Sequence, residues 1–201
     1  FEMCDRQRFY QVVAGRRIAD MFHSVPVTGL EPGKSYRYRI YAKVVENDES
    51  AYAVDYGPER RVKIAGDGVI RTLDRNADKC RFFMLCDIHG KDANFQALTK
   101  GIDKKNFDFL VMNGDMFSYI SSADSLMRHV FHAVPALTSS IPTVYTRGNH
   151  ETRGREAHML QDICPTPTGE PYFLLRQGPV ALLIIDGGED KPDSAPAYPG
   201  T

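Results

Sequence analysis

The strongest constraint on the fold is the alternation of apolar runs and helical stretches in the second half of the chain. The apolar runs have the length of buried strands and lie at residues 81–86, 107–112 and 142–146. Between and after them, apolar residues recur at helical spacing over residues 93–102, 126–137 and 155–163. Two more apolar runs flank Gly178-Pro179, at residues 172–176 and 180–185, and predict a hairpin. This order is typical of an α/β sheet with crossover connections.

The first part of the chain has a different pattern, one of short strands separated by turn residues. The predicted strands lie at residues 9–13, 21–27, 35–45 and 69–73. This all-β pattern favours a sandwich, of which only part is visible. The polar stretch 71–79 lacks apolar periodicity and is expected to be the boundary. The sequence therefore predicts a β module over residues 1–75 and an α/β domain over residues 79–201.

Charge and hydropathy exclude some classes of partner. The formal net charge is -1 and the pI is near 6.7, so the chain lacks the basic field that binding of polymeric nucleic acid usually needs. The longest apolar stretch, around residues 180–185, is far shorter than the roughly 20 residues that span a bilayer. We therefore expect neither a nucleic-acid polymer as substrate nor a membrane span in this chain.

Polar residues follow directly after three of the predicted strands. They are Asp87-Ile-His89, Gly114-Asp115 and Gly148-Asn149-His150. Ligands of open α/β sheets bind beyond the carboxyl ends of the strands, so these three loops are expected to converge on one crevice. Carboxylate, imidazole and amide ligands together suit Mn, Fe or Zn. Two such ions about 3.5–4 Å apart can clamp the oxygens of an in-line displacement at phosphorus and generate hydroxide at neutral pH.

Taken together, Asp-x-His, Gly-Asp and Gly-Asn-His-Glu resemble the motifs of the calcineurin-like metallophosphoesterase family, over residues 81–186. The resemblance implies a four-layer α/β/β/α domain and two divalent or mixed-valence metal ions, Mn, Fe or Zn. It also implies roles for individual residues. Asp87 and His89 would bind the first metal, Asp115 would bridge both, and Asn149 would bind the second. His150 would contact the substrate phosphate and help to protonate the leaving oxygen.

The segment Gly29-Leu30-x-Pro32-Gly33-x-x-Tyr36 resembles the sheet-crossing corner of a fibronectin type III module. Such a module ahead of a metallophosphoesterase domain resembles the arrangement in purple acid phosphatases. This sequence departs from those enzymes in two places. Its first motif has His89 where they have glycine, and Ser118 stands where they have a metal-binding tyrosine, with Tyr119 displaced by one. We expect His89 to replace that tyrosine as a ligand and the purple iron-tyrosinate colour to be absent.

The family completes its site with histidines from two later motifs, whereas the last histidine of this sequence is His158. The hypothesis that follows is a chain cut from a longer protein, lacking the C-terminal part of its catalytic domain. Two neighbours of the motifs have open roles. Arg147 is a candidate for binding substrate phosphate or for a surface ion pair. Glu151 is expected either to cap the following segment or to orient His150.

The leading prediction is a dinuclear-metal phosphoesterase that hydrolyses a phosphorylated small molecule by a metal-activated hydroxide. It would act as an acid phosphatase-like phosphomonoesterase or as a phosphodiesterase on nucleotides or phospholipid head groups. The alternative is a β-sandwich binding or adhesion module beside a degenerate, non-catalytic metallophosphoesterase domain. The resemblance to secreted phosphatases implies an extracellular or periplasmic location.

Overall fold

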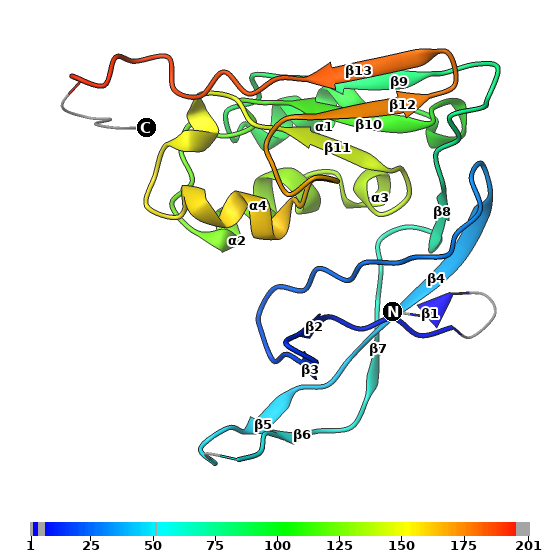
Figure 1. Cartoon of the computed structure of the whole chain (residues 1–201), viewed down its shortest axis with the longest axis vertical. Helices are drawn as coiled ribbons and strands as arrows, with labels where there is room; N and C mark the ends of the chain where they lie inside the picture. Colours follow the sequence, from blue (N-terminus) through cyan, green and yellow to red (C-terminus); the bar gives the residue numbers. More distant parts are fainter. Residues whose placement is uncertain (1, 4–6, 51, 196–201) are drawn as a thin grey trace.

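The computed structural model describes residues 2–3, 7–50 and 52–195 of the 201-residue chain (Figure 1). Its centre is a three-stranded parallel sheet in the order β11-β10-β9. These strands are β9 (Phe82–Leu85), β10 (Phe109–Asn113) and β11 (Thr143–Thr146). They confirm the three strands predicted from apolar runs, and their parallel pairing confirms the crossover topology.

The predicted helices are present but shorter and more broken than their apolar spacing indicates. The first two connections carry α1 (Asp92–Thr99), η1 (Lys104–Asn106), α2 (Ala123–Leu126), the π-helical turn η2 (Met127–His132) and α3 (Pro135–Thr138). After β11 come η3 (His150–Thr152), η4 (Ala157–Met159) and α4 (Leu160–Ile163). The stretch 126–137 is divided because Pro135, which lacks a backbone N–H, starts a new helix at its first position.

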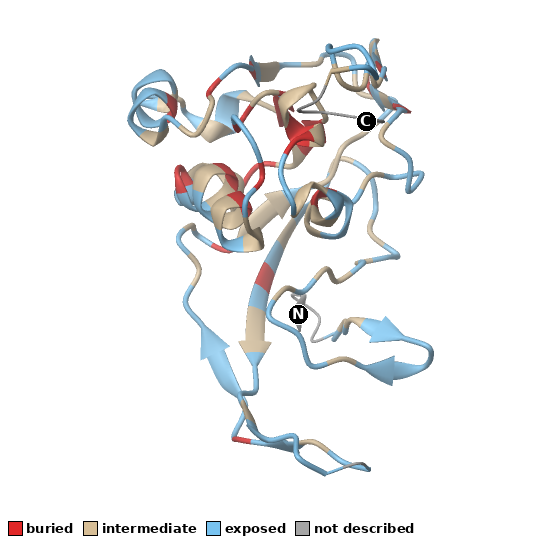
Figure 2. Ribbon diagram, turned by 90° about the vertical axis from the view of Figure 1, so that its left-hand side faces the viewer, coloured by how far each residue is buried: buried red, intermediate tan, exposed pale blue. Residues whose placement is uncertain are grey.

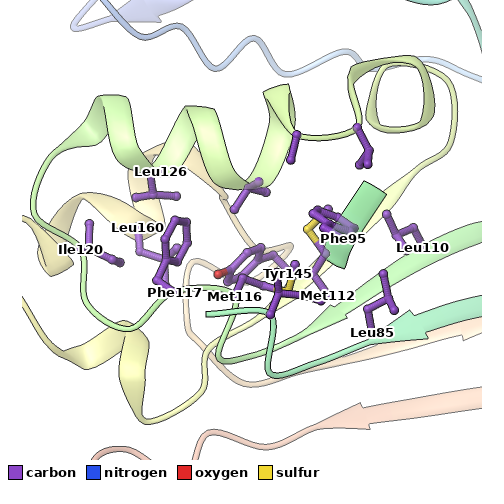
Figure 3. Packing of buried hydrophobic residues seen from close by; sticks show 14 of the residues in the cluster. Leu85, Phe95, Leu110, Met112, Met116, Phe117, Ile120, Leu126, Tyr145 and Leu160 are labelled. Carbon is purple, nitrogen blue, oxygen red and sulfur yellow. The ribbon is translucent and has the colours of Figure 1, made fainter. Parts of the chain in front are cut away.

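Alternate residues of β10 belong to two different hydrophobic cores, one on each face of the sheet. Leu110 and Met112 are fully buried against the helices, in a cluster that also contains Phe95 and Phe117. Figure 3 shows these side chains pointing toward one another, with Tyr145 at the centre of the group. Successive residues of a strand point to opposite faces of the sheet, so the residues between them line the other side.

That other side is covered by the predicted hairpin, β12 (Phe173–Gln177) and β13 (Val180–Ile184). The second core joins it to the sheet through Phe109, Val111, Val144, Phe173 and Ile184. The described part of the domain thus has a helical layer, a parallel sheet and a hairpin (Figure 1). The finer four-layer arrangement is not confirmed.

The N-terminal module is a small antiparallel sheet with two hairpins. The sheet contains β1 (Glu2–Met3), β4 (Ser35–Ala42), β7 (Arg60–Val62) and β8 (Val69–Arg71). The hairpins pair β2 (Val12–Val13) with β3 (Arg16–Arg17), and β5 (Val45–Asn47) with β6 (Asp55–Tyr56). The strand predicted at 21–27 is wrong. Those residues pair with no strand of the described chain, and Pro26 lacks a backbone donor.

A fibronectin III-like sandwich is not confirmed for this module. Before residue 75, Tyr38 is the only large apolar side chain that is buried in the part of the chain the structure describes. Figure 2 shows the contrast, with buried residues gathered around the helices and the parallel sheet and few in the N-terminal module. Sandwich sheets bury one face each against the other. The described strands of this module bury too little apolar surface to form such a core.

Polar contacts attach the N-terminal module to the α/β domain. The Tyr38 hydroxyl donates to the backbone oxygen of Ser139 at 2.6 Å, and Lys104 Nζ lies 3.0 Å from an Asp67 carboxylate oxygen. The two units are therefore in direct contact, although the boundary between 75 and 79 stays a prediction. Among the described residues, no helix combines the length and apolar character that crossing a membrane requires.

Candidate metal centre

Three loops meet at the carboxyl edge of the parallel sheet, as the order of strands and motifs predicts. Hydrogen bonds between backbones join the first loop to the second. Asp87 N donates to Gly114 O at 3.3 Å, His89 N to Asp115 O at 3.0 Å, and Gly90 N to the carbonyl oxygen of residue 116 at 2.8 Å. The first two motifs therefore form one continuous backbone structure.

Side chains from all three loops form a cluster that fits a metal ion. One ligand atom from each of His89, Asp115 and His150 lies within 4.8 Å of the others. The two imidazole rings meet edge to face, with centroids 4.6 Å apart and planes at 82°. Asp87 lies beside this cluster, with its Oδ1 3.8 Å from His89 Nε2 and a side chain that is 66% exposed. Carboxylate and imidazole donors at this separation suit a borderline divalent ion.

Three non-glycine residues of the site have left-handed backbone conformations. The φ angles are +56° at Asp87, +52° at His89 and +53° at Asp115. Such conformations are uncommon for residues with a Cβ and tend to collect at active sites and ligand clamps, where the surrounding structure imposes them. Here the hydrogen bonds between the first two loops impose them. The side chains are thus aimed by the backbone before any ion binds.

The second and third loops touch through their glycines. A Cβ added to Gly114 would lie 2.8 Å from the backbone of Gly148, and one added to Gly148 would lie 2.3 Å from Asp115 Oδ1. Real Cβ atoms do not approach other heavy atoms so closely, so glycine is required at both positions. This contact brings Asn149 and His150 to the same place as Asp115.

The buried carboxylate of Glu151 ties the second and third loops together. Its side chain is 1% exposed. Oε2 accepts from the backbone N–H groups of Asp115 at 2.8 Å and Gly148 at 2.9 Å, and Oε1 accepts from Met116 N at 2.8 Å. Oε1 also accepts from the Tyr145 hydroxyl at 2.7 Å. Neither expectation for Glu151 matches these bonds, because its partners are three backbone N–H groups of the loops and the Tyr145 hydroxyl rather than His150.

The Tyr145 hydroxyl stays protonated and donates a hydrogen bond to Glu151. Burial first, and the neighbouring Glu151 carboxylate second, hold the pKa of Tyr145 well above its usual value. The hydroxyl therefore remains a donor throughout the physiological range. Tyr145 thus links the buried helical core to the loops that carry the candidate ligands.

His150 is oriented through its ring and through its backbone. Nδ1 lies 2.8 Å from the carbonyl oxygen of Ser118, an acceptor that fixes the proton on Nδ1. The backbone N–H of His150 donates to Asp115 Oδ1 at 3.1 Å. The other ring nitrogen, Nε2, lies 3.1 Å from Arg153 Nη1 and can accept a hydrogen bond from that guanidinium. Ser118, which stands where purple acid phosphatases have tyrosine, contributes through its backbone.

The segment after β13 folds back over the third loop. We call residues 186–190 the acidic loop, because it contains Asp186, Glu189 and Asp190. Asp186 accepts a bidentate pair of hydrogen bonds from the Arg147 guanidinium. Arg147 was expected to bind phosphate or to form an ion pair, and in the structure it forms an ion pair with Asp186. Its other expected role, in substrate binding, stays a prediction.

Arg153 connects the acidic loop to His150. Its Nε lies 2.7 Å from Glu189 Oε2, and its Nη2 lies 2.5 Å from Glu189 Oε1 and 2.7 Å from Asp190 Oδ1. Its Nη1 lies 3.1 Å from each ring nitrogen of His150. The side chain of Arg153 is 9% exposed and that of Glu189 is fully shielded from solvent. This pair anchors the acidic loop beside the candidate site.

Acid should loosen the acidic loop. Arg153 holds the pKa of Glu189 well below its usual value of 4.5, mainly through its hydrogen bonds. A depressed carboxyl pKa contributes stability above the unfolded value, and this contribution declines as the pH falls below it. We therefore expect amide hydrogen exchange at residues 187–190 to accelerate, relative to β10, between neutral pH and about pH 3. Equal protection of both regions across that range would contradict this anchoring role.

The structure thus brings together four of the six predicted site residues, namely Asp87, His89, Asp115 and His150. The other two, Arg147 and Asn149, face the acidic loop, where Asn149 Nδ2 lies 3.1 Å from Asp190 Oδ1. The roles of all six residues stay predictions.

Sequence reasoning missed the acidic loop and Arg153 as parts of the site. One signal was present in the sequence, because polar residues after Ile184 follow a strand end as the three motifs do. His129 of η2 also contacts the segment that follows the first motif, because its Nδ1 lies 2.7 Å from an Asp92 carboxylate oxygen.

Comparison with known proteins agrees with this geometry. Residues 80–191, more than half of the chain, match the calcineurin-like phosphoesterase family. The chain belongs to this family. Membership of the calcineurin-like phosphoesterases implies divalent metal ions, for which the cluster of His89, Asp115 and His150 is a candidate site. No curated protein matches the chain.

Among solved structures, this calcineurin-like phosphoesterase is similar to the purple acid phosphatase PPD1 isolated from seeds of yellow lupin, Lupinus luteus. The TM-score is 0.51 at 13% sequence identity, and the match covers 77% of this chain and 30% of the lupin chain. At that identity the likeness shows a shared fold. This chain therefore spans less than one third of the length of the lupin protein it resembles.

Proposed function

We propose that the full-length protein hydrolyses phosphate esters with two divalent metal ions. The observation that carries the proposal is the convergence of His89, Asp115 and His150 from three separate loops, in a chain of the calcineurin-like phosphoesterase family. Asp87 and His89 would hold the first ion, Asp115 would bridge to the second, and Asn149 would bind the second. When bound, such ions neutralise charge on the phosphoryl oxygens and lower the pKa of an attacking water.

Asp115 is held in place for a bridging role. Its Oδ1 accepts the backbone N–H of His150, its backbone N–H is bonded to Glu151, and its left-handed φ aims the side chain toward the other loops. The carboxylate therefore has little freedom to rotate away. Preorganised charge of this kind stabilises a transition state without reorganisation at the moment of reaction.

His150 is placed to contact the substrate phosphate and to protonate the leaving oxygen. Its Nδ1–H remains bonded to Ser118 O, so proton transfer through Nε2 would require the Arg153 guanidinium, 3.1 Å away, to move aside. Arg147 could bind phosphate only after partial release of its bond to Asp186.

The substrate we propose is a phosphorylated small molecule, a mono- or diester, processed outside the cell or in the periplasm. The near-neutral charge of the chain supports a small substrate over a nucleic-acid polymer. A binding or adhesion role for the N-terminal module is not favoured, because its described part offers no packed sandwich. The aligned catalytic motifs support an enzyme instead.

The test uses the full-length protein. We expect it to contain two metal ions per chain by mass spectrometry, and to hydrolyse a generic aryl phosphate with loss of turnover on chelation. Readdition of Mn, Fe or Zn should restore turnover, since these ions suit the donor set. Comparing an aryl monoester with a bis-aryl diester would distinguish the two substrate classes. Protein that binds no metal and turns over neither ester would refute the proposed function.

A further inference from the structure

Asp190 of the acidic loop contacts a residue that the proposed function makes a metal ligand. Asn149 Nδ2 lies 3.1 Å from Asp190 Oδ1. We propose that Asp190 is a positioning residue that fixes the orientation of the Asn149 amide at the metal centre. This inference rests on the proposed dinuclear function, in which Asn149 binds the second ion.

The chemistry of the two groups determines which amide atom faces which way. An ionised carboxylate only accepts hydrogen bonds, whereas an amide has one donor end and one acceptor end. Asp190 therefore selects the orientation of Asn149 in which Nδ2 faces the carboxylate. In the flipped orientation two acceptor oxygens would face each other. The selected orientation leaves Oδ1, the atom that can bind a cation, for the metal centre.

The main chain of Asn149 is already fixed, so the amide orientation is the main freedom that remains. Its φ and ψ angles are -68° and -31°, an unstrained helical conformation at the start of η3. The neighbouring Gly148 N–H is bonded to Glu151, and the Asn149 carbonyl accepts from the Thr152 hydroxyl at 2.7 Å. None of these bonds involves the Asn149 amide. Asp190 supplies the contact that does.

Asp190 is itself held in position from three sides. Arg153 Nη2 lies 2.7 Å from its Oδ1, Lys191 Nζ lies 2.6 Å from its Oδ2, and its backbone N–H donates to Glu189 Oε1 at 2.9 Å. The two cations hold the carboxylate by one oxygen each, and Glu189 fixes Arg153 in turn. Partners of metal ligands in this position orient the ligand and tune its affinity.

The test measures metal binding rather than turnover. In metal-free full-length protein titrated with Mn or Zn, we expect Asp190→Ala to weaken binding of the second ion about 10-fold to 100-fold, the usual effect of losing a ligand's partner. Binding of the first ion, which Asp87 and His89 hold, should be unchanged. Asp190→Asn keeps an oxygen that accepts from Asn149 Nδ2, so its second-ion affinity should stay within about threefold of wild type.

A matched control is Asp193→Ala, which removes an exposed carboxylate three residues further along and should leave both affinities unchanged. Unchanged affinity for the second ion in Asp190→Ala would overturn the inference while wild-type protein still binds two ions. Equal losses in Asp190→Ala and Asp190→Asn would also overturn it, because they would indicate a charge effect rather than amide orientation. Wild-type protein that binds fewer than two ions would refute the proposed function itself and this inference with it.

Discussion

Replacement of Asp115 by asparagine should remove most turnover of the full-length protein, by at least about 100-fold, the scale of losing one preorganised electrostatic contact. The carboxylate lies in the cluster with His89 and His150, where the proposed bridging role requires its negative charge. Asparagine, like aspartate, tolerates a left-handed φ better than most residues with a Cβ, so the +53° conformation should survive and the variant should isolate the charge. Metal content and aryl phosphate turnover would be measured together.

A suitable control for this variant is Asp124→Asn. That residue is exposed on α2 and pairs with Arg128 of the adjoining turn η2. Its loss should change neither metal content nor turnover, because exposed pairs of this kind contribute little. Full activity of Asp115→Asn would refute the assignment of Asp115 to the metal centre.

Replacement of Glu151 by glutamine should destabilise the protein by about 3–5 kcal/mol, although the two side chains have the same shape. The carboxylate accepts four hydrogen bonds, two at each oxygen. In glutamine one oxygen becomes an NH₂ group that faces donors, so two of these bonds are lost and their donors remain buried without acceptors. Urea unfolding would report the change through its midpoint.

Two further variants calibrate this result. Tyr145→Phe removes only one donor to the same carboxylate and should cost about 1–3 kcal/mol. Glu170→Gln, on an exposed turn, should change stability by less than about 0.5 kcal/mol. A loss below about 1 kcal/mol for Glu151→Gln would contradict the anchoring role, since it would mean that the loops keep their positions without the carboxylate.

The α/β domain was predictable because its pattern is local. β10 is buried on both faces, so its residues form the continuous apolar run that the sequence shows. The order of strands then places Asp87, Asp115 and His150 at one edge without further information. The N-terminal module was less predictable. Its short strands are mostly exposed. The alternation of Tyr36 and Tyr38 with arginines marked β4, and the predicted strand at 69–73 contains its partner β8, but β1 and β7 were not predicted.

The remaining parts of the site depend on contacts between residues distant in sequence. The left-handed φ at Asp87 and His89 depends on bonds to the second loop. Aspartate and histidine adopt this conformation more often than most residues with a Cβ, but that preference alone does not select it here. Glu151 has an ordinary helix-start sequence context, and its role appears only once three backbone N–H groups surround it. The acidic loop reaches residues 147–153 across more than thirty positions of chain.

The Glu151 carboxylate, which bonds the second motif loop to the third, also affects how the three loops move. The first loop is bonded to the second, and Glu151 bonds the second to the third, so local opening of one loop breaks contacts in the others. Regions linked in this way open as one cooperative unit. The spacing of the candidate ligands would then change only when the three loops open together. The geometry offered to an ion is therefore set by the stability of this unit as well as by the ligands themselves.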